Sequence, residues 1–168
     1  DTKTWSMVRD CFCDQVYIDY GSISAPTGDP AIPRKADDWL QIVKGTINGF
    51  DMTQHTITNH RYEFDGDTVR CTAYLVAEHF IFASPMMPLA NEGQFITVGG
   101  YYTNDFVQDR GQWRIAKSQL AVTWMRGDAS LFAALMAHRG GDDKFGSVAN
   151  QMAQWRMVAD RESVFGFY

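Results

Sequence analysis

Apolar and polar residues alternate along the middle of the chain, and this period of two is typical of strands with one buried face. Within residues 68–82, every second position is small or apolar, namely Val69, Cys71, Ala73, Leu75 and Ala77. The next position of this series is His79. Two turn signals, Asp65-Gly66-Asp67 and Asp109-Arg110-Gly111, divide the alternating region and predict two hairpins. Their strands are expected over residues 53–64, 68–82, 95–107 and 112–125.

Apolar residues spaced three or four apart predict helices before and after these strands. Trp39, Val43 and Ile47, for example, fall on one stripe. The helices are expected over residues 1–12, 34–50, 128–138 and 147–168, with a loop over 21–33, an apolar insert over 84–93 and a linker over 140–143. A short strand that contains Tyr20 separates the first two helices.

Gly99 and Gly100 interrupt the third long strand. Paired glycines inside a strand mark a bulge or a sharp bend, which curls the sheet. Helices that precede and follow a long curved antiparallel sheet in the sequence predict an α+β fold, a cone with one deep cavity. Because the chain has 168 residues, we expect residues 1–168 to form a single domain.

The first hairpin places two histidines next to each other. If its loop is the three residues 65–67, counting back along both strands places His55 opposite Ala77. His79 is then the diagonal neighbour of His55, about 7–8 Å away between backbones and on the same apolar face. Since imidazole titrates near neutral pH, the pair predicts a site of proton transfer. The alternative is two buried histidines that bond only to backbone groups.

Composition and charge narrow the class of protein. The net charge is −5 and the basic residues are scattered, which argues against a nucleic-acid partner. No apolar run of about 18 residues predicts a membrane span. Cys11, Cys13 and Cys71 form no disulfide or metal-binding pattern, so we expect reduced thiols, no metal and a cytoplasmic protein. The expected partner is a small-molecule substrate.

Several short motifs, in this order and spacing, resemble the scytalone dehydratase family and, more broadly, the SnoaL-like branch of the cone fold typified by nuclear transport factor 2. The motifs are Asp1-Thr2-Lys3-Thr4-Trp5, Ile18-Asp19-Tyr20, Thr53-Gln54-His55, the strand that ends at His79, and Trp113 with Trp124. The resemblance spans roughly residues 1–132. It implies a cone-shaped fold and a lyase that needs no cofactor.

The resemblance also implies roles for individual residues. In such dehydratases one histidine removes a proton beside a ketone and assists the loss of a hydroxyl group, while an aspartate holds a second histidine. Carried onto this chain, His55 is the acid–base residue and His79 is its partner, oriented by Asp1. Tyr20 is implied to bind and polarise the carbonyl group.

Further residues are expected to contact the substrate. Two hydrogen-bonding positions of the family fall here on Gly100 and Tyr102, and this departure argues for a different substrate. Aromatic and methionine side chains suit a ligand with rings, and Asn59 shares the face of His55 if its strand is regular. The expected substrate contacts are Tyr168, Tyr102, Asn59, Trp39, Phe82 and Met86.

The last predicted helix resembles the first helix of the family, which precedes the Asp-x-Lys-x-Trp motif. Read head to tail, Tyr168 is followed by Asp1, the order that a Tyr-Asp pair of the family requires. We therefore hypothesise a circular permutation, or segments given out of native order, in which residues 147–168 end close to Asp1. The alternative is an ordinary C-terminal helix.

These observations predict a cofactor-independent dehydratase or isomerase that acts on an oxygenated cyclic polyketide or terpenoid intermediate of secondary metabolism. The second hypothesis is a SnoaL-like cyclase or rearrangement catalyst. The third is a non-catalytic cone domain that binds a ligand or a protein. The resemblance also implies a homo-oligomer, a dimer or trimer, and a sheet face with Tyr74, Arg70 and Arg114 is compatible with pairing of copies.

Overall fold

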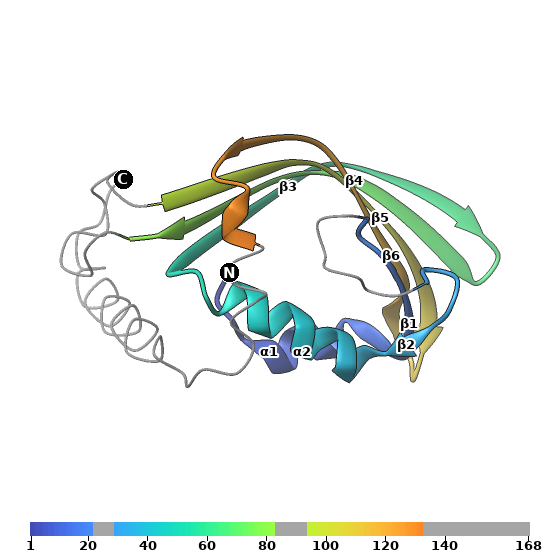
Figure 1. Ribbon diagram of the computed structural model, residues 1–168. Coiled ribbons are helices and arrows are strands. Elements are labelled where there is room, and N and C mark those ends of the chain that lie inside the picture. Colours follow the sequence, from blue (N-terminus) through green and yellow to red (C-terminus); the bar gives the residue numbers. More distant parts are fainter. Residues whose placement is uncertain (22–28, 83–93, 133–168) are drawn as a thin grey trace, which may run out of the picture.

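Six strands form one strongly curved sheet in the computed structural model, which describes residues 1–21, 29–82 and 94–132 (Figure 1). The strands are β1 (Phe12–Asp19), β2 (Arg34–Lys35), β3 (Met52–Asp65), β4 (Thr68–Ile81), β5 (Gln94–Asp109) and β6 (Gln112–Gly127), in the spatial order β2-β1-β6-β5-β4-β3. β1 runs parallel to β6, and all other neighbours are antiparallel. The sheet stays open, and the predicted α+β cone fold is confirmed.

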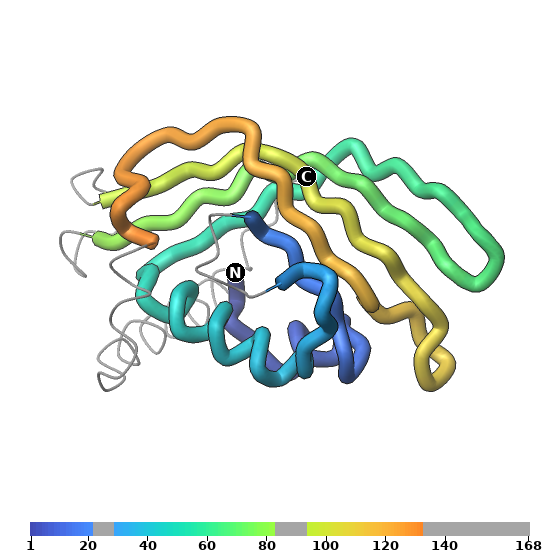
Figure 2. The backbone as a smooth tube through the Cα atoms, turned by 45° about the vertical axis from the view of Figure 1, so that its right-hand side comes forward, coloured from blue at the N-terminus to red at the C-terminus, as the bar shows by residue number. Residues whose placement is uncertain are grey.

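Two helices lie across the concave side of the sheet, α1 (Trp5–Asp10) and α2 (Ala36–Ile47), as Figures 1 and 2 show. Both are shorter than predicted. The first helix ends early because Phe12 pairs with Ile115, and the Ile115 N–H donates to the carbonyl of Cys11 (2.8 Å). Pairing with β6 thus overrides the helical spacing in residues 11–12. The second begins late because residues 34–35 form β2 and pair with β1.

The first hairpin turns more tightly than predicted. Asp65 pairs with Thr68, so the loop has two residues and not three, and Gly66 supplies the left-handed backbone (φ 55°). Continued unchanged along β3, this register would place His55 opposite Glu78. A slip of one residue turns every side chain to the other face, so His55 would then point away from the concave side.

A β-bulge restores the register. Asn59 and His60 of β3 together lie opposite the single residue Ala73 of β4, and Asn59 adopts a left-handed backbone (φ 55°). Beyond the bulge His55 lies opposite Ala77, so this prediction is confirmed, although its premise about the turn is wrong. The bulge also gives Asn59 a different setting from a regular strand residue, and its side chain is exposed.

The glycine pair produces the predicted irregularity. The register of β5 against β6 shifts between Gly99 and Gly100. A Cβ atom on Gly100 would lie 2.1 Å from the carbonyl oxygen of Ala121, and one on Gly99 would overlap the ring of Trp124. Only glycine therefore permits the close approach of the two strands at this bend.

Two clusters of buried side chains lie under the curved sheet. One joins β1 to α2 and consists of Phe12, Val16, Ile18, Ala36 and Trp39. The other lies around the start of β5 and consists of Phe50, Ile96, Val98 and Leu131. Trp39 of the first cluster and Val98 of the second both line one cavity, so the cavity lies between the two clusters.

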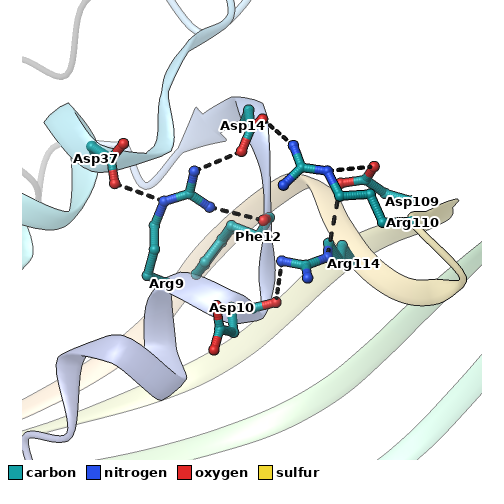
Figure 3. Close-up of polar contacts among 8 residues, drawn as sticks. All are labelled: Arg9, Asp10, Phe12, Asp14, Asp37, Asp109, Arg110 and Arg114. Carbon is teal, nitrogen blue, oxygen red and sulfur yellow. Dashed lines mark hydrogen bonds and ion pairs between the residues drawn. The ribbon is translucent and has the colours of Figure 1, made fainter.

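A network of charged side chains fastens the helices to one end of the sheet (Figure 3). Arg9 of α1 donates to Asp37 of α2 (2.7 Å), to Asp14 of β1 (2.7 Å) and to the carbonyl of Phe12 (3.1 Å). Arg110, at the tip of the β5–β6 hairpin, pairs with the other oxygen of Asp14. One guanidinium thus connects three elements, and Asp14 extends the connection to a fourth.

We expect Arg9→Met to lower the free energy of unfolding by about 1–2 kcal/mol, which is about 3–6 °C in Tm for a domain of this size. Most of the loss comes from the unpaired carbonyl and the joint loss of two ion pairs, since each exposed pair alone contributes little. Thermal unfolding measures it. Arg61→Met, which removes an exposed pair within β3, is the matched control and should leave Tm unchanged. Equal shifts for both variants would show that the network has no special role.

The outer face of the sheet exposes aromatic side chains, with Tyr74 at 59% and Trp124 at 48% of full exposure. Arg114 was expected on this face but is only 14% exposed. Its guanidinium donates instead to the carbonyl of Asp10 (2.8 Å), one of the contacts drawn in Figure 3. Pairing of copies through the outer face remains a prediction. No helix within the described ranges is long and apolar enough to cross a membrane.

Candidate active site

A cavity of about 340 Å³ lies between the two helices and the concave side of the sheet. Its wall is mainly aromatic and aliphatic. The polar residues in it are Asp1, Thr2, Lys3, Thr4, Tyr20, Thr46, His55, His79 and Tyr102. The ribbon of Figure 1 and the tube of Figure 2 both place the N-terminus between the helices and the sheet. Asp1 can therefore reach this wall.

The two histidines meet on the wall of the cavity. Their ring centroids are 5.4 Å apart, and the ring planes are nearly perpendicular. His79 is 3% exposed and packs against the rings of Phe50 (4.9 Å) and Phe132 (5.1 Å). His55 is more open, with 28% of its side chain exposed. The structure thus brings together the pair that the hairpin register predicts.

Asp1 holds His55 and not His79, which corrects the predicted role of the aspartate. One carboxylate oxygen accepts hydrogen bonds from Nδ1 of His55 (2.6 Å) and from Oγ1 of Thr53 (3.1 Å). The other accepts the backbone N–H of His55 (2.9 Å). The reason is topological: Asp1 lies beside the edge strand β3, while His79 lies one strand further in. Nδ1 of His79 contacts the carbonyl of Ile96 instead (3.4 Å).

Both imidazoles are neutral at neutral pH. Burial lowers the pKa of His55 to about 4. Burial and the neighbouring His55 lower the pKa of His79 to about 4, against a smaller opposite effect of backbone carbonyls. Because a carboxylate only accepts hydrogen bonds, we assign the ring proton of His55 to Nδ1. Its Nε2 then carries a free lone pair, which a general base needs.

The lowered pKa of His79 predicts that the fold loses stability in mild acid. Between pH 6.5 and 4 the unfolded chain binds a proton at this histidine and the folded chain does not, so stability falls as the pH falls. A shift of this size corresponds to on the order of 3 kcal/mol for one buried group. Urea unfolding at a series of pH values measures the slope. His79→Gln should flatten it over this range, and an unchanged slope in this variant would contradict the prediction.

Tyrosines form a second polar group on the wall. The hydroxyl of Tyr20 shares a hydrogen bond with Oγ of Ser118 (3.0 Å). The ring of Tyr20 meets Trp39 edge-on (4.9 Å between centroids) and lies 5.9 Å from the ring of Tyr102. Burial raises the pKa of Tyr20 and of Tyr102. Both phenols therefore keep their protons and can donate to a substrate oxygen.

The remaining predicted contacts fall in different places. Trp39 lines the cavity. Phe82, which follows the end of β4 and donates its backbone N–H to Asp51 (2.7 Å), is not among the residues of the cavity wall. Asn59 is not among them either, because the bulge leaves it exposed. Neither residue lines the cavity, and their contacts with a substrate stay predictions.

Other predictions fall on residues outside the described ranges. They concern Met86, Tyr168, the apolar insert over 84–93, the linker over 140–143 and the helix over 147–168 with its proposed permutation. The helix predicted over 128–138 is described only at its start, where residues 130–132 are helical. Asp128 caps this start by accepting from the N–H of Ser130 (2.9 Å).

Several polar residues of the site were not predicted from the sequence, and three of them make hydrogen bonds there. Thr53 shares the face of His55, so strand alternation could have identified it. Lys3 lies within the motif Asp1-Thr2-Lys3-Thr4-Trp5. Its contact with the carbonyl of Phe50 (2.5 Å) joins segments far apart in the sequence, so no local pattern predicts it. Ser118 is 2% exposed and could have been found only from the pairing of β6 with β5. Next to it in the sheet, Oδ1 of Asn104 is buried without a hydrogen-bond partner.

The site offers acid–base groups and no evident set of metal ligands. Within the part of the chain that the structure describes, no three side chains of His, Cys, Asp or Glu converge as metal ligands would. What the arrangement provides is an oriented imidazole with a free lone pair, a second imidazole beside it, two phenol donors and an apolar wall. Such a set can remove a proton from carbon and stabilise the charge that develops.

Comparison with known proteins gives a family match. The model of a family described as SnoaL-like domain matches residues 1–119. None of the curated proteins matches the chain in sequence. Among solved structures, the Kfla4162 protein from Kribbella flavida is 27% identical with a TM-score of 0.66, and the match covers 79% of this chain and 86% of that one.

Two further structures bear on the fold. A candidate scytalone dehydratase from Novosphingobium aromaticivorans is 18% identical with a TM-score of 0.54, and the match covers 74% of each chain. A hexachlorocyclohexane dehydrochlorinase, LinA-type3, from Novosphingobium barchaimii is 18% identical with a TM-score of 0.54, covering 77% of this chain and 80% of the other. At these identities the likeness shows the shared cone fold.

Proposed function

Because the chain belongs to the SnoaL-like domain family, we propose that it is a cofactor-independent enzyme that removes a proton from carbon and eliminates a leaving group from the neighbouring carbon. The observation that carries the proposal is the contact of Asp1 with Nδ1 of His55 (2.6 Å) at the wall of a mainly apolar cavity. It fixes the imidazole with Nε2 free to act as the base.

The proposed reaction is the loss of water from a ring ketone with a hydroxyl group on the β-carbon. Nε2 of His55 takes the proton from the α-carbon, and the electron pair of that C–H bond forms the enolate. Asp1 stabilises the imidazolium that results. The enolate then expels the hydroxyl group, which takes the proton back from Nε2 and leaves as water. The products are a conjugated enone and the neutral imidazole.

His79 has a supporting role in this scheme. With Nδ1 directed at the carbonyl of Ile96, its Nε2 can accept a hydrogen bond. A hydroxyl group of the substrate can donate to this atom and still receive the proton from His55. His79 therefore holds the leaving group next to the base, since the two rings are 5.4 Å apart.

Tyr20 and Tyr102 bind an oxygen of the substrate further along the cavity. Tyr102 lies opposite Ala73 of β4, four residues before Ala77, which faces His55. Along the strands the two positions are about 13 Å apart, and across the sheet β3 and β5 are two strands, about 10 Å, apart. Both side chains reach into the cavity from its wall, which shortens the distance between their polar groups. The substrate is therefore a compound of one or two rings with oxygen at both ends. A small polyketide or terpenoid intermediate has this character.

The loss of a halide is the second candidate reaction. The neutral state of His79 favours it, because burial lowers the pKa of this group to about 4 and leaves the cavity without a strong acid. A chloride ion departs without a proton, whereas hydroxide does not. The hexachlorocyclohexane dehydrochlorinase that shares the fold carries out an elimination of this class by name. The base, His55 held by Asp1, would be the same.

A panel of bicyclic ring ketones tests the proposal. Each compound carries either a hydroxyl or a chloride on the β-carbon, and the conjugated enone is followed by its ultraviolet absorbance. The proposal expects turnover of at least one compound, with His79→Gln slower on the hydroxyl series than on the chloride series. Thermal-shift measurements give binding separately. Compounds that bind but are never converted would instead support a non-catalytic binding domain, and rearranged products would support a cyclase.

A further inference from the structure

Asp1 needs a restraint that its own contacts do not supply. Its carboxylate makes three hydrogen bonds, all with Thr53 and His55 of β3. Its side chain is nevertheless 39% exposed. Water therefore competes for the carboxylate oxygens, and a mobile main chain would let the group turn away from His55.

Lys3, two residues after Asp1, contacts the segment that leads into β3, the strand that Asp1 also contacts. Its Nζ donates to the carbonyl of Phe50 (2.5 Å), just before β3 begins at Met52. Residues 1–3 thus lie alongside residues 50–55 and are connected to them at both ends. The connection consists of side-chain contacts only, Lys3 to Phe50 at one end and Asp1 to His55 at the other.

The backbone of Lys3 is held in a conformation that needs such support. Its φ is 55°, in the left-handed region that residues other than glycine rarely adopt. This turn directs the chain from the start of α1 back toward β3. Asp51, whose carboxylate accepts the N–H of Phe82 (2.7 Å), adds a negative charge beside the ammonium group. Burial lowers the pKa of Lys3, and Asp51 opposes that effect.

We propose that Lys3 is a positioning residue, whose bond to the Phe50 carbonyl keeps the Asp1 carboxylate on Nδ1 of His55 and so keeps Nε2 free as the base. The inference rests on the proposed function, because it explains how the base is oriented. Lys3 lines the cavity, and the contact that gives it the positioning role is the bond of its ammonium group to the Phe50 carbonyl.

The role of Lys3 can be tested without a substrate, by measuring which ring nitrogen of His55 carries the proton. Two-bond proton–nitrogen correlation spectra distinguish an imidazole protonated on Nδ1 from one protonated on Nε2. In the unaltered protein we expect the Nδ1–H form. In Lys3→Met the ratio of the two forms should move about tenfold toward Nε2–H, the size expected for the loss of one hydrogen bond from a charged donor. Lys3→Arg, which keeps a charged donor, should preserve the original ratio.

Two controls define the range of the measurement. Asp1→Asn replaces the carboxylate by a neutral amide and should weaken the preference for Nδ1–H. Thr2→Ala removes only a hydrogen bond within the same segment, Thr2 to Thr4 (3.0 Å), and should change nothing. If Lys3→Met does not fold, Lys3→Gln offers an uncharged donor with a shorter reach and should give a smaller shift in the same direction.

The outcomes separate this inference from the proposed function. A Lys3→Met spectrum identical to that of the unaltered protein, next to a shifted Asp1→Asn spectrum, overturns the role of Lys3. An unaltered protein with its proton on Nε2 overturns it as well. A tautomer shift in a protein that converts none of the ring ketones would support the role of Lys3 and remove the proposed enzymatic function.

Discussion

Replacing His55 by glutamine is expected to lower kcat/KM about 10²–10⁴-fold on the best substrate of the ring-ketone panel, the range typical of a positioned acid–base group. Glutamine keeps a polar side chain of similar length, but its amide does not accept a proton at neutral pH. Binding of the substrate should change little, because the aromatic wall of the cavity is intact. The measurement is a comparison of kcat and KM for the two proteins.

His60→Gln is the matched control for this substitution. His60 lies on the same strand, is exposed, and stacks against Tyr62 outside the cavity. We expect its kcat/KM to equal that of the unaltered protein. If His55→Gln and His60→Gln lose the same small amount of activity, the loss in His55→Gln does not come from a proton transfer.

The largest expected effect on stability is that of Gly100→Ala. The new Cβ would lie 2.1 Å from the carbonyl oxygen of Ala121, and a backbone oxygen cannot move aside as the end of a flexible side chain can. Forcing β5 and β6 apart at this bend should cost about 3 kcal/mol or more in the free energy of unfolding. That corresponds to a fall in Tm of roughly 6–12 °C for a domain of this size. Thermal unfolding by circular dichroism measures it.

Gly45→Ala provides the opposite case in the same chain. Gly45 lies inside α2, and a Cβ atom there would meet no atom within 4 Å. Alanine is the better helix former, so this variant should be more stable by about 0.5–1 kcal/mol. If both alanine variants shift Tm by the same amount, the close approach of β5 and β6 at Gly100 does not constrain the fold.

The need for glycine at position 100 also explains the departure from the dehydratase pattern there. The resemblance implies a hydrogen-bonding side chain at this position, but the sheet has no room for any side chain. In this part of β5, Tyr102 lines the cavity and is therefore the residue that we expect to contact the substrate. A tyrosine fills more space than a small polar residue, which supports a substrate different from that of the dehydratase.

Strand alternation predicted the histidine pair correctly, but through two departures that compensate each other. The turn is one residue shorter than the sequence indicates, and the bulge at Asn59 and His60 adds the residue back. Neither is readable from the period of two, because both depend on how β3 fits against β4. Asn59 was misplaced for the same reason: the bulge changes the face of every residue between it and the turn.

Contacts between segments far apart in the sequence could not be predicted from residue patterns and motif spacing. The resemblance named Asp1 correctly as a partner of a histidine but assigned it to His79. Asp1 bonds to His55 because it lies beside the edge strand β3, and only the structure shows this position. Lys3 and Ser118 each bond to a residue at least 47 positions away, and such contacts leave no mark in local periodicity.

The central claim, that Nε2 of His55 takes a proton from carbon, is tested most directly by hydrogen exchange. A bicyclic ketone without a leaving group, 2-tetralone, is incubated with the protein in D₂O, and deuterium uptake beside the carbonyl is followed by NMR. The account predicts uptake at least tenfold faster than in buffer, and uptake at the buffer rate with His55→Gln. Equal uptake with the two proteins would contradict it.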